Sequence, residues 1–172
     1  MSRSIAHIRI AQKEDCASIA KIYNHYLGKS TMDLEMKRGA YYDSILQNQD
    51  DMEEIWVIEE QGLIGWGIIK KYSDREGYKY TGETSVYLHP NHLNQGHGKT
   101  LKIHLMERCR VLGYHHLLAR IFAENEVSIQ YNLKLGYTLV GIQKEAGFVD
   151  NEWKDVAILQ YIFPNKKGDK LT

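Results

Sequence analysis

The sequence predicts a single α/β domain built on a mixed sheet, and three observations support this fold. Short β-branched or apolar runs, typical of strands, alternate with longer segments in which apolar residues recur at helical spacing. Two runs, 55–59 and 63–71, are separated by residues 60–62 alone, which indicates an antiparallel hairpin. Helical segments separate other runs, which indicates crossover connections, and a sheet with both kinds of connection is mixed.

The first half of the chain is expected to supply one strand, two helices and this hairpin. Residues 6–10 alternate weakly between apolar and polar side chains, as a strand does. Apolar residues at helical spacing over 16–27 predict a helix that ends at Gly28, and 35–49 predict a second, weaker helix. Beyond the hairpin, the polar residues 74–80 predict a loop.

The second half begins with a strand over 83–89, which Pro90 ends because proline cannot donate to the ladder. A polar loop over 91–98 then opens onto a helix over 99–112, whose apolar residues share one face and which Gly113 ends. The remaining elements are expected to be strands at 116–122, 137–144 and 155–163 and a helix at 127–135. The predicted order is therefore β-α-α-β-β-β-α-β-α-β-β.

The composition is that of one globular domain. The 172 residues are 43% hydrophobic and 26% charged, and no linker divides the chain, so we expect one domain over 1–172 with a frayed, solvated tail at 165–172. Lys and Arg number 22, as do Asp and Glu, so the formal net charge is zero. Because proteins that grip nucleic acid or anionic membranes carry a basic excess, neither partner is expected.

The two cysteines indicate a reducing compartment. Cys16 and Cys109 are far apart and neither lies in a Cys-x-x-Cys pattern, so a disulfide scaffold or a zinc site is not expected. The first ten residues lack the apolar region of a secretory signal, and no apolar run approaches the length of a membrane span. These features predict a cytoplasmic protein.

The most informative segment is the strand that leads through Gly96-His97-Gly98 into a helix. The first turn of a helix has unpaired N–H groups and a positive dipole end, and glycines let the backbone approach a phosphate. The segment therefore predicts a pyrophosphate site. It is not a P-loop, because the Gly-x-x-x-x-Gly-Lys-Ser/Thr spacing is missing, and it lacks the third glycine of the dinucleotide fingerprint.

This segment resembles the acetyl-CoA-binding motif of the GNAT superfamily of N-acetyltransferases, Gln/Arg-x-x-Gly-x-Gly/Ala after a strand. Gly96 and Gly98 match the two glycine places, whereas Leu93 stands at the Gln/Arg place. A later stretch, Asn125 and Ser128 followed by Leu135-Gly136-Tyr137, is similar to the superfamily's Asn-x-x-Ala/Ser leading to Leu-Gly-Phe/Tyr. The resemblance implies a GNAT-like mixed, mostly antiparallel sheet flanked by helices, with acetyl-CoA as co-substrate and no metal in catalysis.

Finer pieces resemble the phosphinothricin and methionine sulfoximine acetyltransferase branch, in register over residues 7–163. The pieces are residues 22–26 with Ser30 and Thr31, then 75–78, 83–87 and 153–156. The resemblance implies a small-molecule acceptor, an amino acid or an analogue such as phosphinothricin, methionine sulfoximine or methionine sulfone, and a homodimer. The branch usually carries Thr-Phe-Glu near Thr31, where this chain has Met32-Asp33-Leu34-Glu35, so the side chain of the acceptor stays open.

Glu83 is the candidate catalytic base. Amide formation needs an amine that has lost a proton, and Glu83 begins the strand that runs into the phosphate loop, beside the expected thioester. A carboxylate partly buried among aromatic residues can act near neutral pH, directly or through water. The matching glutamate of the branch is assigned this role, while an exposed glutamate at a strand end is the structural alternative.

The resemblance also assigns residues that hold acetyl-CoA. They are Val86, Tyr87, Leu88, Asn94, Gln95, Gly96, His97, Gly98, Lys99, Asn125 and Ser128. The backbone of Val86 and Leu88 is expected to pair with the pantetheine arm and to supply an oxyanion donor. The family's proton-donating tyrosine would fall at Asn132, with Tyr131 one residue earlier, so Tyr131 is either a proton donor or a packing residue.

Three residues are candidates for acceptor binding. Arg75 and Tyr78 precede the strand of Glu83, and an arginine can pair with the carboxylate of an amino acid, although a solvated surface arginine is equally consistent. Trp66 is expected either to wall the pocket or to lie in the core. The chain has eight histidines, but no His-Glu-x-x-His or comparable spacing occurs, so no metal site is predicted.

Two other functions remain open from the sequence. The same chemistry can serve a polyamine, an aminoglycoside or a protein amine. Alternatively, the off-pattern Leu93 and Asn132 are consistent with a non-catalytic acyl-CoA-binding module, although the presence of Glu83 argues against it. Consumption of bound acetyl-CoA separates the enzyme from the binding module.

Overall fold

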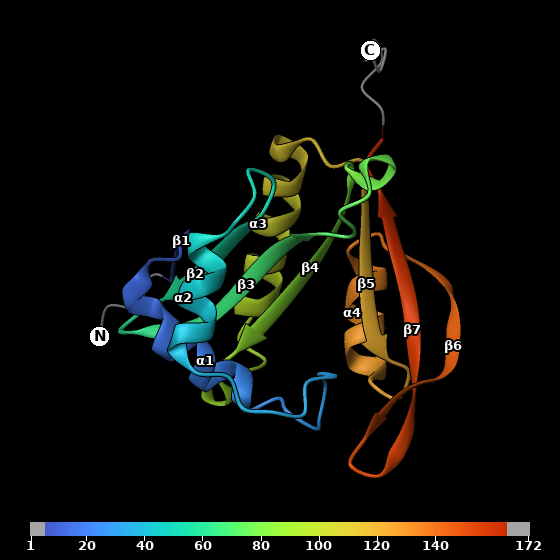
Figure 1. Cartoon of the computed structure of the whole chain (residues 1–172), viewed down its shortest axis with the longest axis horizontal. Coiled ribbons are helices and arrows are strands. Elements are labelled where there is room, and N and C mark those ends of the chain that lie inside the picture. Colours follow the sequence, from blue (N-terminus) through green and yellow to red (C-terminus); the bar gives the residue numbers. More distant parts are fainter. Residues whose placement is uncertain (1–5, 165–172) are drawn as a thin grey trace.

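A computed structural model describes residues 6–164 and shows the predicted order of elements (Figure 1). The strands are β1 (His7–Ile10), β2 (Glu54–Glu59), β3 (Leu63–Lys71), β4 (Thr81–Leu88), β5 (His116–Phe122), β6 (Thr138–Val149) and β7 (Glu152–Ile162). The helices are α1 (Cys16–Asn24), α2 (Gly39–Gln47), α3 (His97–Leu112) and α4 (Glu126–Lys134). The expected tail, 165–172, lies outside the described residues. None of the helices in the described part of the chain is long and apolar enough to cross a membrane.

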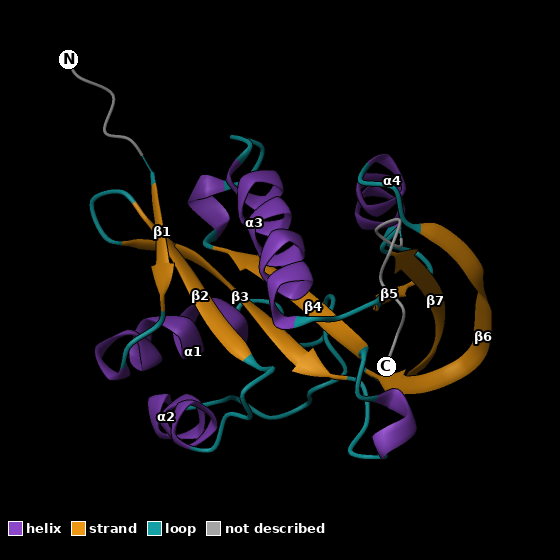
Figure 2. Cartoon of the chain, turned by 90° about the horizontal axis from the view of Figure 1, so that it is seen from above, coloured by secondary structure: helices purple, strands orange, loops and turns teal. Residues whose placement is uncertain are grey.

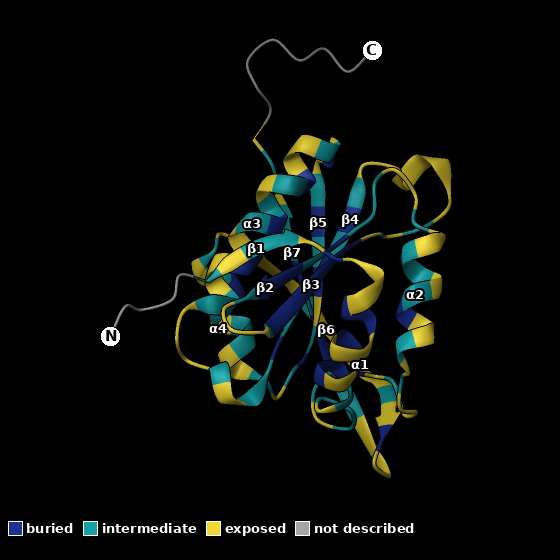
Figure 3. Ribbon diagram, turned by 90° about the vertical axis from the view of Figure 1, so that its left-hand side faces the viewer, coloured by how far each residue is buried: buried dark blue, intermediate teal, exposed yellow. Residues whose placement is uncertain are grey.

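The seven strands form one sheet in the order β1-β2-β3-β4-β5-β7-β6. Neighbouring strands are antiparallel except β4 and β5, which are parallel, so the expected mixed, mostly antiparallel sheet is confirmed. Figure 2 shows α1 and α2 on one face of the sheet and α3 and α4 on the other. Because both faces are covered, β3 is buried almost continuously, as its dark colour in Figure 3 shows.

The backbone pairing between the parallel strands β4 and β5 is short. Only three residue pairs join the two strands, and the last of them is Glu83 with Leu118. Beyond this pair the strands separate, as Figure 1 shows. Residues 84–88 and 119–122 therefore face one another without backbone pairing, which leaves a gap in the sheet.

Helix faces predicted from periodicity are buried. In α3, Leu101, Leu105 and Cys109 are fully buried against the sheet. On the opposite face of the sheet, Ile19 of α1 packs in a cluster with Trp66 of β3. Burial of these apolar faces supplies the main favourable free energy that holds the helices on the sheet.

Several predicted boundaries are wrong by a few residues, because side-chain bonds and turns set them. The amide of Asn24 binds the backbone of Lys37 in both directions, at 2.7 and 2.8 Å, so α1 ends at Asn24 and α2 does not begin until Gly39. Asp150 and Asn151 have φ of 52° and 63°, the left-handed pair of a two-residue hairpin turn, so β6 runs on to Val149 and β7 begins at Glu152, beyond the predicted limits of 144 and 155.

Candidate active site

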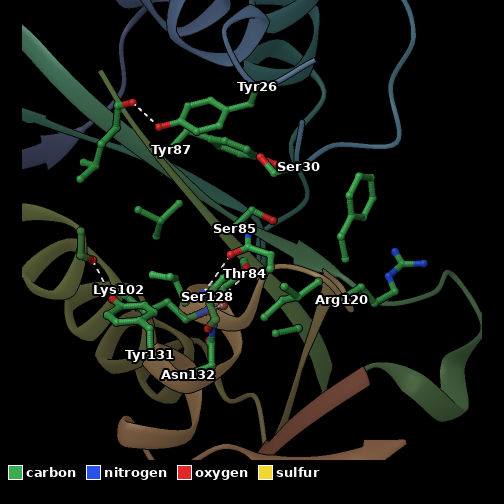
Figure 4. A pocket seen from close by; sticks show the side chains of 18 of the residues that line it. Tyr26, Ser30, Thr84, Ser85, Tyr87, Lys102, Arg120, Ser128, Tyr131 and Asn132 are labelled. Carbon is green, nitrogen blue, oxygen red and sulfur yellow. Dashed lines mark hydrogen bonds between the residues drawn. The ribbon is translucent and has the colours of Figure 1, made fainter. Parts of the chain in front are cut away.

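A cleft of about 520 Å³ occupies the gap between β4 and β5, with α3 and α4 along its other side (Figure 4). The sequence-predicted cofactor residues that line it are Val86, Tyr87, Leu88, Asn94, Gly98, Asn125 and Ser128. Four further predicted residues, Gln95, Gly96, His97 and Lys99, do not line it, but they share its loop and the first turn of α3. The fold thus gathers the two sequence motifs around one cleft.

The edge of β4 presents free backbone groups to this cleft. The carbonyl of Leu88 accepts a bond from Tyr26 Oη at 2.6 Å, and that of Thr84 accepts one from Lys102 Nζ at 3.4 Å. These two carbonyls therefore point away from β3. Because backbone groups of alternate residues point the same way, the N–H groups of Val86 and Leu88 also face the cleft. An extended chain that carries amides can pair with such an edge.

The N-terminus of α3 closes one end of the cleft. The helix begins at His97, two residues earlier than predicted, and its N-cap Gly96 has φ of 87°, a left-handed conformation that favours glycine. Gly98 lies against Leu88, whose Cδ1 would be 3.3 Å from a Cβ at this position. The N–H groups of the first turn have no acceptor within the helix, so they are available to an anion such as a pyrophosphate.

Helix α4 holds the opposite wall of the cleft in place. The Oδ1 atom of Asn125 accepts a bond from the Ser128 N–H at 3.1 Å, which caps α4. Tyr131 Oη donates to the carbonyl of Gly98 at 2.9 Å and so ties α4 to the first turn of α3. Asn132 is buried and donates through Nδ2 to the Ser128 carbonyl at 2.9 Å, but its Oδ1 has no partner.

A second hollow of about 390 Å³ opens beside Glu83 and shares Thr84, Ser85, Ala119 and Arg120 with the cleft. The cleft and this acceptor hollow therefore meet at the gap between β4 and β5. Arg120 donates to one Glu83 oxygen at 2.8 Å, while the other oxygen is buried without a partner. Glu83 is the third residue of β4, not its first as predicted, and its side chain is 21% exposed, so the exposed strand-end alternative is wrong.

The segment that departs from the phosphinothricin branch borders this hollow. Met32 and Asp33 line it, and Tyr23 donates a hydrogen bond to Asp33. Burial favours a raised pKa for Asp33, but the hydrogen bond from Tyr23 and the ion pair with Lys37 outweigh it and hold the pKa below its usual value. The hollow therefore carries two carboxylates, those of Asp33 and Glu83, and the guanidinium of Arg120.

The three residues predicted to bind an acceptor are not brought together. Arg75 and Tyr78 are exposed in the connection between β3 and β4 and line neither the cleft nor the acceptor hollow. Trp66 is 2% exposed and packs against Tyr42 and Tyr87, which agrees with the core alternative. It also borders a narrow recess of about 210 Å³ that Glu83 and Arg120 share.

Sequence reasoning missed two cations of the site. Arg120 lies between apolar residues of β5, and Lys102 lies on the buried face of α3 with Leu105 and Cys109. A charge at an apolar position was the signal available for both. The sequence could not show that both side chains reach the gap.

The fold also brings together three possible metal ligands that are separated in the sequence. Glu60 lies near His92 and His97, with one ligand atom from each within 4.8 Å of the others. The sequence spacing gave no sign of it, because Glu60 lies in the turn between β2 and β3. None of the three residues lines the cleft or the acceptor hollow, so the expectation of metal-free chemistry there is unaffected.

Comparison with known proteins agrees with this geometry. The sequence matches the acetyltransferase (GNAT) domain family over residues 8–158. It is 32% identical to the L-methionine sulfoximine/L-methionine sulfone acetyltransferase of Salmonella typhimurium, over 89% of this chain and 92% of that protein. It is 30% identical to the phosphinothricin N-acetyltransferase of Streptomyces viridochromogenes, over 94% of this chain and 90% of that one.

A solved structure shares the whole fold. A GNAT superfamily phosphinothricin acetyltransferase from Sinorhizobium meliloti, crystallised with acetyl-CoA, superposes with a TM-score of 0.86 at 27% identity, covering 97% of this chain and 93% of that chain. An open sheet split between two parallel strands, with a helix N-terminus beside the split, is thus the architecture of an acyltransferase. The chain belongs to the GNAT acetyltransferase family.

Proposed function

We propose that the protein transfers the acetyl group of acetyl-CoA to the amine of an amino acid or a close analogue, such as phosphinothricin, methionine sulfoximine or methionine sulfone. The observation that carries the proposal is the meeting of the cleft and the acceptor hollow at the gap between β4 and β5. A donor in the cleft and an acceptor in the hollow can react directly in a ternary complex there, since their reacting atoms are held together.

The cleft suits acetyl-CoA along its length. Its pyrophosphate fits the free N–H groups at the start of α3, where Gly96 and Gly98 leave room for it. Its pantetheine amides can pair with the exposed edge of β4, and Asn125 lies on the opposite wall. A free N–H of Val86 or Leu88 would then stabilise the oxyanion that forms at the thioester carbon.

The acceptor hollow suits an α-amino acid. The amine attacks the thioester carbon, a C–N bond forms as the C–S bond breaks, and the amine proton passes to Glu83 directly or through water. Arg120 offers N–H donors to the carboxylate of the acceptor, since a guanidinium has five and Glu83 occupies one. The activities of the two named relatives, which act on amino-acid analogues, support this acceptor class.

The first test is the release of free CoA thiol from acetyl-CoA with a panel of acceptors. Amino acids, methionine sulfoximine, methionine sulfone and phosphinothricin form one set, and polyamines and aminoglycosides form the other. We expect release with the first set and little with the second. Release with a polyamine or an aminoglycoside alone would reassign the acceptor. Binding of acetyl-CoA without release by any acceptor would favour a non-catalytic acyl-CoA-binding module.

We further propose a cytoplasmic homodimer. The edge strand β6 carries exposed apolar side chains, among them Val140, 57% exposed, and Trp153 of β7 beside it is 62% exposed. An apolar edge of this kind is usually covered by another chain. Sedimentation equilibrium should give twice the chain mass, and a monomer at micromolar concentration would contradict the proposal. Cys16 and Cys109 are buried free thiols, as suits a reducing cytoplasm.

A further inference from the structure

Lys102 is a buried cation that the mechanism above does not use. It is 4% exposed on α3, and its Nζ donates to Thr84 Oγ1 at 2.6 Å and lies 5.0 Å from the centre of the Tyr137 ring. No carboxylate pairs with it among residues 6–164. A buried ammonium without a counter-charge is unfavourable, and such groups concentrate at functional sites.

Lys102 lies where a group that takes part in the reaction is expected to lie. Its side chain lines the cleft beside Thr84 of β4, at the point where β4 and β5 separate. Figure 4 shows Lys102, Thr84 and Asn132 gathered at the same end of the cleft. This end adjoins Glu83, where the thioester must lie if Glu83 takes the amine proton.

Four other polar side chains of the cleft are poorly suited to deliver a proton to a leaving thiolate. Asn132 does not ionise, and the guanidinium of Arg120 does not give up its proton in proteins. Tyr131 already donates its hydroxyl to the Gly98 carbonyl, and burial raises its pKa well above the usual value. Tyr26 likewise donates to the Leu88 carbonyl.

Given the acetyl transfer proposed above, we propose that Lys102 is the general acid that protonates the CoA thiolate as it leaves. The sulfur atom accepts the proton from the Lys102 ammonium, which becomes a neutral amine and regains a proton from solvent before the next turnover. The thiol so formed would be held on two sides, because the sulfur can accept a bond from Lys102 and the S–H can donate to the unpartnered Oδ1 of Asn132.

The protonation state of Lys102 suits this role. Burial lowers its pKa to about 8, close to the ordinary thiol value of about 8.5, so proton transfer between them is nearly balanced. The titratable groups that face it are Cys109 of its own helix, Tyr137 before β6 and Tyr131 of α4. Burial raises the pKa of all three, so they stay neutral while Lys102 titrates. The acid form is present below pH 8 and is lost above it.

The first test is the pH dependence of kcat in Lys102→Met. The wild-type kcat should fall as the pH rises past about 8, whereas the variant should have a kcat about 100-fold lower with no such fall. Its KM for acetyl-CoA should change little. Lys102→Arg should not restore kcat, since arginine keeps the charge but does not release the proton. Tyr131→Phe, the matched control, should keep the alkaline fall.

A second measurement needs no acceptor and so separates this inference from the proposed acetyl transfer. The ultraviolet absorbance of thiolate reports the ionisation of bound CoA, and Lys102 should make this thiol ionise at a lower pH in the wild type than in Lys102→Met. Equal titration curves, or a Lys102→Met enzyme with wild-type kcat and the same alkaline fall, would overturn the inference. Absence of thiol release by the wild type with any acceptor would instead count against the acetyl transfer.

Discussion

At the scale of single residues, the two carboxylate oxygens of Glu83 have different environments, and both suit the proposed catalytic base. One carboxylate oxygen is held by Arg120 at 2.8 Å, which fixes the side chain, and the other is buried and free to accept a proton. A base held in this way loses little freedom when the amine arrives, because its orientation is already set. The same ion pair places the guanidinium beside the acceptor hollow.

Glu83→Gln tests this assignment. The amide keeps the shape and the bond from Arg120 but cannot take a proton, so we expect turnover to fall by about 100-fold or more while acetyl-CoA binds as before. Steady-state kinetics and calorimetry measure the two quantities. Glu76→Gln, an exposed change in the connection before β4, is the control and should be neutral. Full turnover in Glu83→Gln would remove Glu83 from the mechanism.

Arg120 and Arg75 are rival partners for the carboxylate of the acceptor. A charge-assisted hydrogen bond contributes about 1.5–3 kcal/mol, so Arg120→Met should raise the KM for an amino acid by roughly tenfold or more. The exposed Arg75→Met should change it much less. The KM for the corresponding amino-acid amide, which has no carboxylate, should not change in Arg120→Met, whereas turnover should fall with either acceptor because Arg120 also holds Glu83. A larger effect of Arg75→Met would restore the sequence-based assignment.

The two cations of the site show where sequence reasoning stops. Gly96 and Glu83 lie in local patterns typical of a phosphate-binding loop and of the family's base, so both could be proposed as site residues from the sequence. Arg120 and Lys102 lie in no pattern. Their relevance depends on how α3 crosses the sheet and on where β4 and β5 separate, and these are contacts between residues far apart in the chain.

At the scale of elements, the two ends of α3 offer a matched pair of glycines. Gly96 before the helix and Gly113 after it have φ of 87° and 93°, and a Cβ at either position would meet nothing within 4 Å. An alanine at either position should therefore destabilise the fold by a similar amount, about 1–2 kcal/mol. Only Gly96→Ala should also weaken acetyl-CoA binding, since only Gly96 shapes the phosphate loop.

Thermal unfolding and calorimetry test this pair of variants. Equal losses of acetyl-CoA affinity in Gly96→Ala and Gly113→Ala would show that the effect comes from general destabilisation. Unchanged affinity in Gly96→Ala would mean that the pyrophosphate lies elsewhere.

The order of elements could be predicted because apolar periodicity is a local property of the sequence. Several boundaries could not be predicted, because they depend on contacts and turns that apolar periodicity does not reveal. The amide of Asn24 fixes Lys37, and the turn at Asp150 and Asn151 joins two strands that extend well past their apolar segments. The Asp-Asn pair was a turn signal in the sequence that alternation alone did not reveal.

At the scale of the whole molecule, the sheet consists of two parts joined at one place. Strands β1 to β4 form one part and β5 to β7 the other, and the two parts share three backbone pairs between β4 and β5. The strand pattern of the sequence gives no sign of this weak joint. The separation of the strands nevertheless creates the site, because it frees the edge of β4.

A ligand that lies in the gap should hold the two parts together. At a hundredfold excess over Kd, acetyl-CoA should stabilise the fold by about 2.7 kcal/mol. For a chain of this size that raises Tm by roughly 5–10 °C. Hydrogen exchange should slow in both residues 84–88 and residues 119–122, because the pantetheine arm covers the unpaired edge of β4 and excludes water from β5. Protection confined to the start of α3 would mean that only the phosphates are bound, and the placement of the thioester beside Glu83 would then fail.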